Sequence, residues 1–379
     1  MTIIASTRPP VALSGQSITE RVFRDLGGRE GEPALIDGPT GRVLTVGALA
    51  EGIRRLAGGL TERGYAPGRV VAILAPNLPE YAVVFHAVAW AGGTLTTINP
   101  TYTAAEVAFQ LKDSGAELLI TVAPFLDTAR AAAKGTAVRE IAVIGEAQGA
   151  TPLAALMGAP LAEQAPVDVE EHVVVLPYSS GTTGLPKGVM LTHRNLVVNV
   201  DQAVSALPMG PGERSLAFLP FFHIYGQTVF LAVALAQGAV PVTLPRFDLE
   251  LFLRLLAEHR TPLLFCVPPV MLALAKHPMV EQFDLSALRL VYSAAAPADG
   301  ALTQAVAQRL GVTAIQAYGM TELSPVSHVV PEDDPRPGSV GTAVPNTECR
   351  IVDPETGGDR PPGEEGELWI RGPQVMKGY

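Results

Sequence analysis

The chain has 379 residues, a formal net charge of −10 at pH 7, and 48 % hydrophobic against 17 % charged residues. This composition provides enough apolar side chains for a large buried core and argues against intrinsic disorder. No run of lysine and arginine could follow the phosphates of a nucleic acid, so nucleic acid is not an expected partner. Cys266 and Cys349 both lie in apolar segments and are expected to be buried free thiols.

The N-terminus and the apolar runs give no indication of secretion or membrane insertion. Residues 1–10 lack the basic segment followed by an apolar one that a signal peptide requires. The apolar stretch at residues 229–236 is far too short to span a bilayer. We therefore expect a cytoplasmic protein without a membrane span, and the oligomeric state stays open.

Short apolar runs alternate with amphipathic segments over the first 330 residues. Buried strands are predicted over residues 70–74, 118–122, 141–144, 173–176, 215–219, 263–267, 288–292 and 313–317. The clearest helix is predicted over residues 248–259, where Asp248 can cap the N-terminus and Phe252 and Leu256 lie on one face. This alternation predicts an α/β fold with doubly wound, mostly parallel sheets and flanking helices.

Two connecting segments and a change in composition divide the chain. Residues 145–166 are rich in Ala, Gly and Pro, and residues 331–338 carry three acidic residues among prolines. Beyond them, Gly/Pro turns alternate with short strands predicted over residues 348–352 and 367–371, which suggests antiparallel structure from a small β-barrel. The predicted division is a first α/β subdomain at residues 1–170, a second at residues 171–330, and the start of a β-rich subdomain at residues 331–379.

The most informative segment is the loop from Tyr178 to Gly188, with the sequence YSSGTTGLPKG, directly after a predicted strand. Its glycines let backbone N–H groups approach an anion, while the Ser and Thr hydroxyls add donors and Lys187 adds a positive charge. In α/β sheets, phosphates bind at such loops after the carboxyl end of a strand. The loop is not a Walker A motif, because Gly188 stands where that motif has Ser or Thr. A solvated linker would rarely combine this composition with an adjoining buried strand.

Four further segments follow in order: LPFFHIYG at residues 219–226, SAAAP at 293–297, QAYGMTE at 316–322, and the stretch from Gly366 to Tyr379. With the loop, they resemble the motifs of the adenylate-forming (AMP-binding) superfamily, which includes acyl-CoA synthetases, luciferases and peptide-synthetase adenylation domains. The likeness is closest to 4-coumarate:CoA ligase-like acyl-CoA synthetases and runs from about residue 20 onward. It implies that ATP activates a carboxylic acid to an acyl-adenylate, with Mg²⁺ as cofactor, and that the acyl group passes to CoA.

The resemblance also assigns the nucleotide site. Since two anions must meet in this reaction, the site must neutralise charge. Glu322 is the expected Mg²⁺ ligand and Tyr318 the expected ring against adenine. The expected catalytic residues are His223, Thr321, Glu322 and Lys187. The expected ATP contacts are Ser179, Ser180, Gly181, Thr182, Thr183, Lys187, Ala295, Gln316, Ala317, Tyr318 and Thr321, although relatives usually have Gly in place of Ala317.

The expected acyl pocket is small and apolar. By resemblance it is lined by His223, Tyr225, Val229, Ala295, Ala317, Pro325 and Val326. Taken alone, His223 would be read as a core histidine, but within its motif it is expected to orient the carboxylate and gate the acyl tunnel. No charged side chain is available for an amino acid's ammonium group, which argues against a peptide-synthetase role. A hydroxycinnamate and a medium- or long-chain fatty acid both fit.

Arg246 corresponds to a position where relatives carry a basic residue that contacts the phosphates of CoA, although an ordinary surface arginine is an alternative. The chain ends before the family's ribose-binding aspartate, its hinge and its C-terminal lysine. The resemblance therefore implies a large N-terminal part without the small C-terminal domain. Two other functions stay open: a non-catalytic nucleotide- or acyl-binding module, and an oxidative adenylate-forming enzyme like luciferase.

Overall fold

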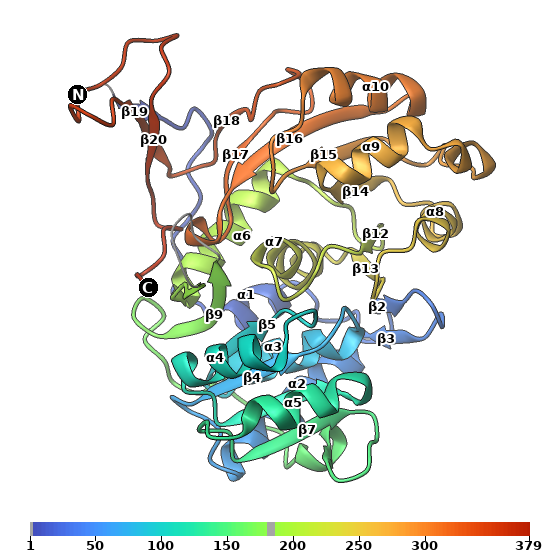
Figure 1. Cartoon of the computed structure of the whole chain (residues 1–379), viewed down its shortest axis with the longest axis vertical. Helices are drawn as coiled ribbons and strands as arrows, with labels where there is room; N and C mark the ends of the chain where they lie inside the picture. The colour runs from blue at the N-terminus through green and yellow to red at the C-terminus, as the bar shows by residue number, and fades with distance from the viewer. Residues whose placement is uncertain (1–2, 180–185) are drawn as a thin grey trace.

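The computed structural model describes residues 3–179 and 186–379 (Figure 1). Within these residues the chain forms four β-sheets with helices between and around them. Most segments coloured blue to green form the lower part of the view in Figure 1, the orange segments form the upper part, and the N-terminus lies at the upper left beside the red strands. The predicted α/β fold with doubly wound, mostly parallel sheets is confirmed.

The largest sheet lies in the lower part of Figure 1. Its parallel strands are, in spatial order, β9 (Val173–Ser179), β5 (Thr94–Ile98), β4 (Val70–Leu74), β6 (Leu118–Val122), β7 (Glu140–Ile144) and β8 (Thr151–Pro152). Two short strands, β10 (Lys187–Gly188) and β11 (Leu191–Thr192), pair antiparallel with β9. The strands predicted at residues 70–74 and 118–122 are confirmed at those bounds, and β7 and β9 extend the predicted segments.

Alternate residues of β4 face two separate cores, as expected for a sheet with helices on both sides. Val71 and Ile73 belong to one cluster, together with buried residues of α2 (Val46–Glu62) and α3 (Pro79–Trp90). Ala72 and Leu74 belong to the second cluster, together with residues of α4 (Ala104–Ser114) and α5 (Leu126–Ala133). The sheet is therefore buried on both faces, and its functional surface is left to the strand ends.

Two smaller sheets make up the rest of the α/β part. One contains β12 (Arg214–Ala217), β13 (Val240–Thr243), β2 (Pro33–Asp37) and β3 (Val43–Thr45) in that order. The other contains β14 (Leu263–Cys266), β15 (Leu290–Ser293), β16 (Thr313–Gly319), β17 (Val326–Val329) and β18 (Thr342–Ala343) in that order. In the second sheet, β14, β15 and β16 are parallel and the last two strands are antiparallel.

The longer helices of this half are α6 (His193–Ala206), α8 (Leu249–Glu258), α9 (Pro268–Lys276) and α10 (Gly300–Leu310). The predicted cap of α8 is confirmed, because the Asp248 side chain accepts a hydrogen bond from the Leu251 N–H at 2.9 Å. Shorter helices are α1 (Ile18–Phe23), α7 (Ile224–Thr228), the π-helix η3 (Val229–Ala234) and the 3₁₀ segments η1 (Ala123–Phe125), η2 (Leu153–Leu156), η4 (Pro278–Gln282) and η5 (Thr321–Leu323). None of the helices described is long and apolar enough to cross a membrane.

The β-rich part is a three-stranded antiparallel sheet in the order β1 (Ile4–Ala5), β19 (Glu348–Val352) and β20 (Glu367–Arg371), of which the last two strands are red in Figure 1. The strands predicted at residues 348–352 and 367–371 are confirmed. The expectation of a barrel is wrong for the residues described here, where the sheet is open. Three strands are too few to close a barrel, and one edge is taken by a strand from the opposite end of the chain.

Strands are shared across the first predicted subdomain boundary. Strand β9 begins after residue 170 but pairs with β5 in the largest sheet. Strands β2 and β3 come from the first 45 residues but join β13 and β12. The division at residues 170 and 330 therefore stays a prediction, and the sheets interleave across it.

Candidate active site

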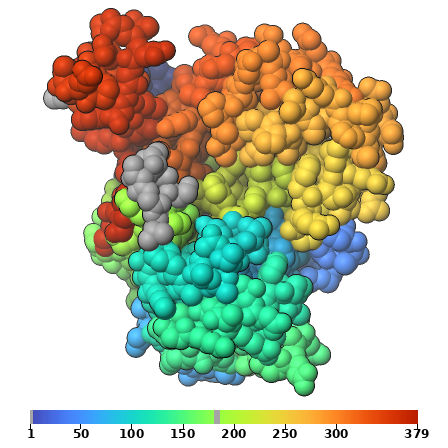
Figure 2. Space-filling model, in the orientation of Figure 1, coloured from blue at the N-terminus to red at the C-terminus, as the bar shows by residue number. Residues whose placement is uncertain are grey.

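A cavity of about 610 Å³ lies between the two halves of the α/β part. It is lined by residues after the carboxyl ends of β9, β15 and β16, by one face of α6, and by α7 and η3. Figure 2 shows the surface recessed between the yellow-to-orange part of the chain and the cyan part. Ligands of open α/β sheets bind at carboxyl strand ends, and the volume is in the range of small-molecule sites.

The predicted acyl-pocket residues all line this one cavity, although they come from four segments of the sequence. They are His223, Tyr225, Val229, Ala295, Ala317, Pro325 and Val326. The predicted nucleotide residues Ser179, Tyr318, Thr321 and Glu322 line the same cavity. An acid and a nucleotide bound here would therefore share one cavity.

His223 stands at the N-terminal cap of α7. Its Nδ1 accepts a hydrogen bond from the Tyr225 N–H at 3.2 Å, so the neutral ring carries its proton on Nε2. The surrounding protein removes water from the imidazole and lowers its pKa, which favours the neutral form at pH 7. His223 is thus fixed as a hydrogen-bond donor at the cavity wall, an arrangement suited to orienting a carboxylate oxygen.

The turn at residues 293–297 follows β15 and forms another part of the wall. Ala295 lies in the left-handed region, with φ of 70°, which an alanine rarely adopts. The turn is supported from behind by Gln316, whose Oε1 accepts a hydrogen bond from the Ala298 N–H at 3.0 Å. Gln316 is buried and does not line the cavity, so its contact with the nucleotide stays a prediction. Strain of this kind is often retained at binding sites.

Glu322 lies in η5, with its carboxylate at the cavity edge. Its Oε1 accepts a hydrogen bond from the Tyr379 hydroxyl at 3.0 Å, and the ring of Tyr379 lies 5.1 Å from the Nζ of Lys187. No group of three or more His, Cys, Asp or Glu side chains among the described residues could hold a metal ion by itself. Glu322 therefore fits a Mg²⁺ ion only if phosphate oxygens and water supply the other ligands, as is usual for Mg²⁺ at nucleotides.

Residues 376–379 are held against η5 and against the segment that follows β10. The Met376 N–H donates to the Glu322 carbonyl at 2.8 Å, and the Lys377 N–H donates to the Met190 carbonyl at 2.9 Å. The Nζ of Lys377 forms an ion pair with the Glu171 carboxylate at 2.7 Å. These contacts fix the position from which Tyr379 reaches Glu322.

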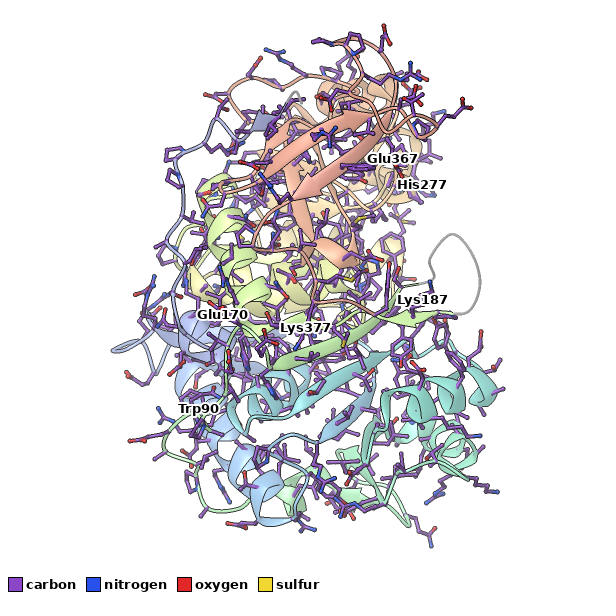
Figure 3. The ribbon with its side chains drawn as sticks, turned by 90° about the vertical axis from the view of Figure 1, so that its left-hand side faces the viewer. Trp90, Glu170, Lys187, His277, Glu367 and Lys377 are labelled. Atoms are coloured by element: carbon purple, nitrogen blue, oxygen red, sulfur yellow. The ribbon has the colours of Figure 1, made fainter. Side chains whose placement is uncertain are left out.

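The predicted phosphate loop is described only at its two ends. Strand β10 pairs Lys187 opposite Ser179 of β9, which makes these residues the stem of a hairpin (Figure 3). The other predicted contacts of the loop lie outside the described residues, namely Ser180, Gly181, Thr182 and Thr183. Arg246, the predicted CoA contact, is exposed between β13 and α8 and does not line the cavity.

The sequence did not assign every cavity residue to the site, and those it missed include Asn199, Phe265 and Tyr292. Phe265 and Tyr292 stack with their ring centroids 5.6 Å apart and an angle of 16° between the planes. Both lie in apolar strands that looked like ordinary core, and only the adjacency of β14, β15 and β16 brings them to the pocket. Asn199 is a polar residue on a buried helix face, a signal that could have marked it for attention.

Comparison with known proteins agrees with this geometry. The model of the AMP-binding enzyme family matches residues 22–379. The chain is 38 % identical over 394 residues to 4-coumarate–CoA ligase 5 of Oryza sativa subsp. japonica, covering the whole chain and 72 % of that protein. It also resembles the solved structure of a long-chain-fatty-acid–CoA ligase from Archaeoglobus fulgidus, with 25 % identity, a TM-score of 0.91, and coverage of 99 % of this chain and 78 % of that one.

A second solved structure, ATP-bound MatB from Rhodopseudomonas palustris, is 30 % identical, with a TM-score of 0.86 and coverage of 96 % of this chain and 71 % of that one. The family match extends over nearly the full chain and includes the segments that line the cavity. On these grounds, the chain belongs to the AMP-binding enzyme family.

Proposed function

We propose that this chain activates a carboxylic acid with ATP to form an acyl-adenylate, and that the acyl group is then transferred to CoA. The observation that carries the proposal is the single cavity in which His223, the small acyl-pocket residues and Glu322 meet. The family match and the acyl-CoA ligases among the similar proteins support the same reaction.

In this proposal the protein brings a carboxylate oxygen to the α-phosphorus of ATP, from which pyrophosphate leaves. His223 donates its Nε2–H to the other carboxylate oxygen and so fixes the direction of attack. Lys187, at the hairpin stem, offers positive charge to the phosphates, and Thr321 offers a hydroxyl donor at the cavity wall. A bound Mg²⁺ would add positive charge at the phosphate oxygens, and Glu322 would be its ligand from the protein.

The acid proposed first is an aromatic one. Tyr225, Phe265 and Tyr292 line the cavity together, which provides ring faces against which a flat acid can pack. The 4-coumarate–CoA ligases among the similar proteins favour the same class. The second candidate is a medium- or long-chain fatty acid, which is favoured by the resemblance to the Archaeoglobus fulgidus ligase.

Arg246 is proposed as a contact for the CoA phosphates, because it is an exposed cation in the loop that leads into α8. A cytoplasmic location, where ATP and CoA are both available, is part of the same proposal. A non-catalytic nucleotide- or acyl-binding module would use the same cavity and would differ from the proposed enzyme only in lacking turnover.

The test is acid-dependent ATP–pyrophosphate exchange with a panel of hydroxycinnamates, benzoates and fatty acids, followed by thioester detection after CoA is added. The proposal predicts exchange that requires one class of apolar acid, and thioester only when CoA is present. Nucleotide and acid binding without any exchange would instead identify a binding module.

A further inference from the structure

The wall of the acyl pocket contains an interruption in the β-ladder. Strand β17 pairs with β16 through an irregular register between Tyr318 and Gly319. On its other side β17 pairs with β18, and the backbone bonding continues as far as the Val344 N–H, which donates to the Ser327 carbonyl at 2.9 Å. Val326, the first residue of β17, lies opposite Gly319 beyond this irregularity, and both its N–H and its carbonyl bond a side chain.

That side chain is Asn199, on α6. The Oδ1 of Asn199 accepts a hydrogen bond from the Val326 N–H at 3.1 Å, and its Nδ2 donates to the Val326 carbonyl at 2.7 Å. Gln202 lies one turn further along the helix and donates from Nε2 to the Pro345 carbonyl at 2.6 Å. The two amides are joined, because the Asn199 Nδ2 also donates to the Gln202 Oε1 at 2.9 Å. We call Asn199 and Gln202 the amide bridge.

The amide bridge is buried away from solvent, and its amide groups are hydrogen-bonded. Asn199 and Gln202 both have 0 % of their surface exposed to solvent. Gln202 also donates to Gln374 Oε1 at 3.2 Å, and Gln374 is itself buried and donates to Thr347 Oγ1 at 2.7 Å. Because the bridge is desolvated and its amide groups are paired, few alternative arrangements of Val326 are available to the native state.

The position that the bridge fixes is part of the pocket. Asn199, Pro325 and Val326 line the cavity, as do the predicted acyl-pocket residues Tyr225 and Val229. The Nδ2 of Asn199 donates to the Val326 carbonyl and to Gln202 Oε1, and its Oδ1 accepts from the Val326 N–H. It is therefore suited to hold the wall rather than to bind a ligand with those groups.

We propose that Asn199 is a positioning residue that determines acid specificity, because it sets how far Val326 and Pro325 reach into the acyl pocket. The inference rests on the proposed function, since it names the residue that controls which acid that function accepts. Gln202 acts indirectly, because it accepts a hydrogen bond from Asn199 and so helps to hold that side chain in place. Loss of the bridge lets the start of β17 move and relaxes the discrimination between acids of different size.

The test compares Asn199→Ala with the matched variant Asn195→Ala. Asn195 lies one turn earlier on α6, is also buried, and also donates to two carbonyls, those of Pro373 and Val375, at 2.9 Å each. It does not line the cavity. A general loss of anchoring should affect both variants alike, whereas a positioning role should be specific to Asn199.

Two measurements are made on each folded variant. The first is hydrogen exchange of the peptide that contains Val326, whose N–H should lose protection in Asn199→Ala and keep it in Asn195→Ala. The second is the ratio of kcat/KM for a bulky acid over a short acid in pyrophosphate exchange. This ratio should change by about tenfold in Asn199→Ala, the size typical of altered pocket packing, while the KM for ATP stays unchanged.

Asn199→Asp is the second variant if Asn199→Ala does not fold, because it keeps the side-chain volume and the acceptor for the Val326 N–H but cannot donate to the Val326 carbonyl. The specificity role would be overturned if the ratio of kcat/KM for the bulky over the short acid stays within twofold of the unmodified protein while hydrogen exchange at the Val326 N–H is accelerated. Unchanged protection at Val326 would overturn the bridge itself. An unmodified protein that activates no acid would instead contradict the proposed function, and the exchange data would still report on the bridge.

Discussion

The hydroxyl of Tyr379 donates a hydrogen bond to Oε1 of Glu322 at 3.0 Å, while the Nζ of Lys187 lies 5.1 Å from the centroid of the same ring. One aromatic side chain thus contacts both the carboxylate proposed for Mg²⁺ and the cation proposed for the phosphates. These three residues come from distant parts of the sequence, and two of them, Glu322 and Tyr379, line the cavity.

Glu322→Gln should raise the Mg²⁺ concentration needed for half-maximal ATP binding by at least about tenfold, because the amide keeps the size but loses the charge that a hard cation requires. The measurement is calorimetric titration of ATP at a series of Mg²⁺ concentrations. Tyr379→Phe is the companion variant, and it should lower the required Mg²⁺ by about threefold, because the hydroxyl no longer occupies the carboxylate. A Glu322→Gln protein that titrates like the unmodified one would remove Glu322 from the metal site.

Lys187→Ala should weaken ATP binding by about a hundredfold, or ~3 kcal/mol, which is typical for one donor lost from a preorganised anion site. Lys377→Ala is the matched control, since the Nζ of Lys377 forms an ion pair with the Glu171 carboxylate, whereas the Nζ of Lys187 lies over the ring of Tyr379. Equal ATP affinity in the two variants, measured by equilibrium dialysis, would contradict the role given to Lys187.

Val229→Phe should block the acyl pocket. Val229 is 6 % exposed and begins the π-helix η3 at the cavity wall, where little added volume can be accommodated. Long and bulky acids should lose most of their kcat/KM in pyrophosphate exchange, and short acids least. A uniform loss across all acids would indicate a folding defect and would not locate the pocket.

The stability of the fold should decrease as the pH falls below neutral. Burial lowers the pKa of His86 from 6.5 to about 4, and its Nε2 lies 2.8 Å from the Leu231 carbonyl. Below pH 6.5 the unfolded imidazole takes up a proton that the folded one refuses until about pH 4, so unfolding binds protons and the free energy of unfolding falls. From this residue alone the loss between pH 7 and pH 5 should be about 2 kcal/mol.

Urea unfolding at pH 7 and at pH 5 measures this loss. His86→Gln should show a smaller difference between the two conditions, because the amide does not titrate in this range. An equal pH dependence in both proteins would assign the acid sensitivity to other groups.

The positions of many apolar strands could be predicted from the sequence, but several strands could not, among them the central strand β5. Strand β5 has the sequence TLTTI, and its threonines hide the apolar pattern. In the folded chain their hydroxyls are satisfied internally, as Thr94 donates to the Val173 carbonyl at 2.6 Å and Thr96 to the Leu176 carbonyl at 2.9 Å. Single-sequence patterns do not show such tertiary partners, so a buried polar strand looks like a loop.

The residues of the candidate site also fall into those that the sequence could predict and those that it could not. Residues inside contiguous motifs, such as His223 and Glu322, could be predicted because the motif carries them together. Asn199 and Tyr292 could not, because only the packing of α6 and β15 around the cavity gives them their place. The Gly/Pro turns between short strands suggested part of a small barrel, whereas the described residues form an open sheet whose third strand, β1, comes from the other end of the chain and is two residues long.

The most direct measurement is ATP–pyrophosphate exchange by the protein, with and without an apolar carboxylic acid. We predict exchange that depends on an aromatic or fatty acid and on Mg²⁺, and that falls about a hundredfold in Lys187→Ala. A protein that binds ATP but shows no exchange with any acid of the panel would contradict the account.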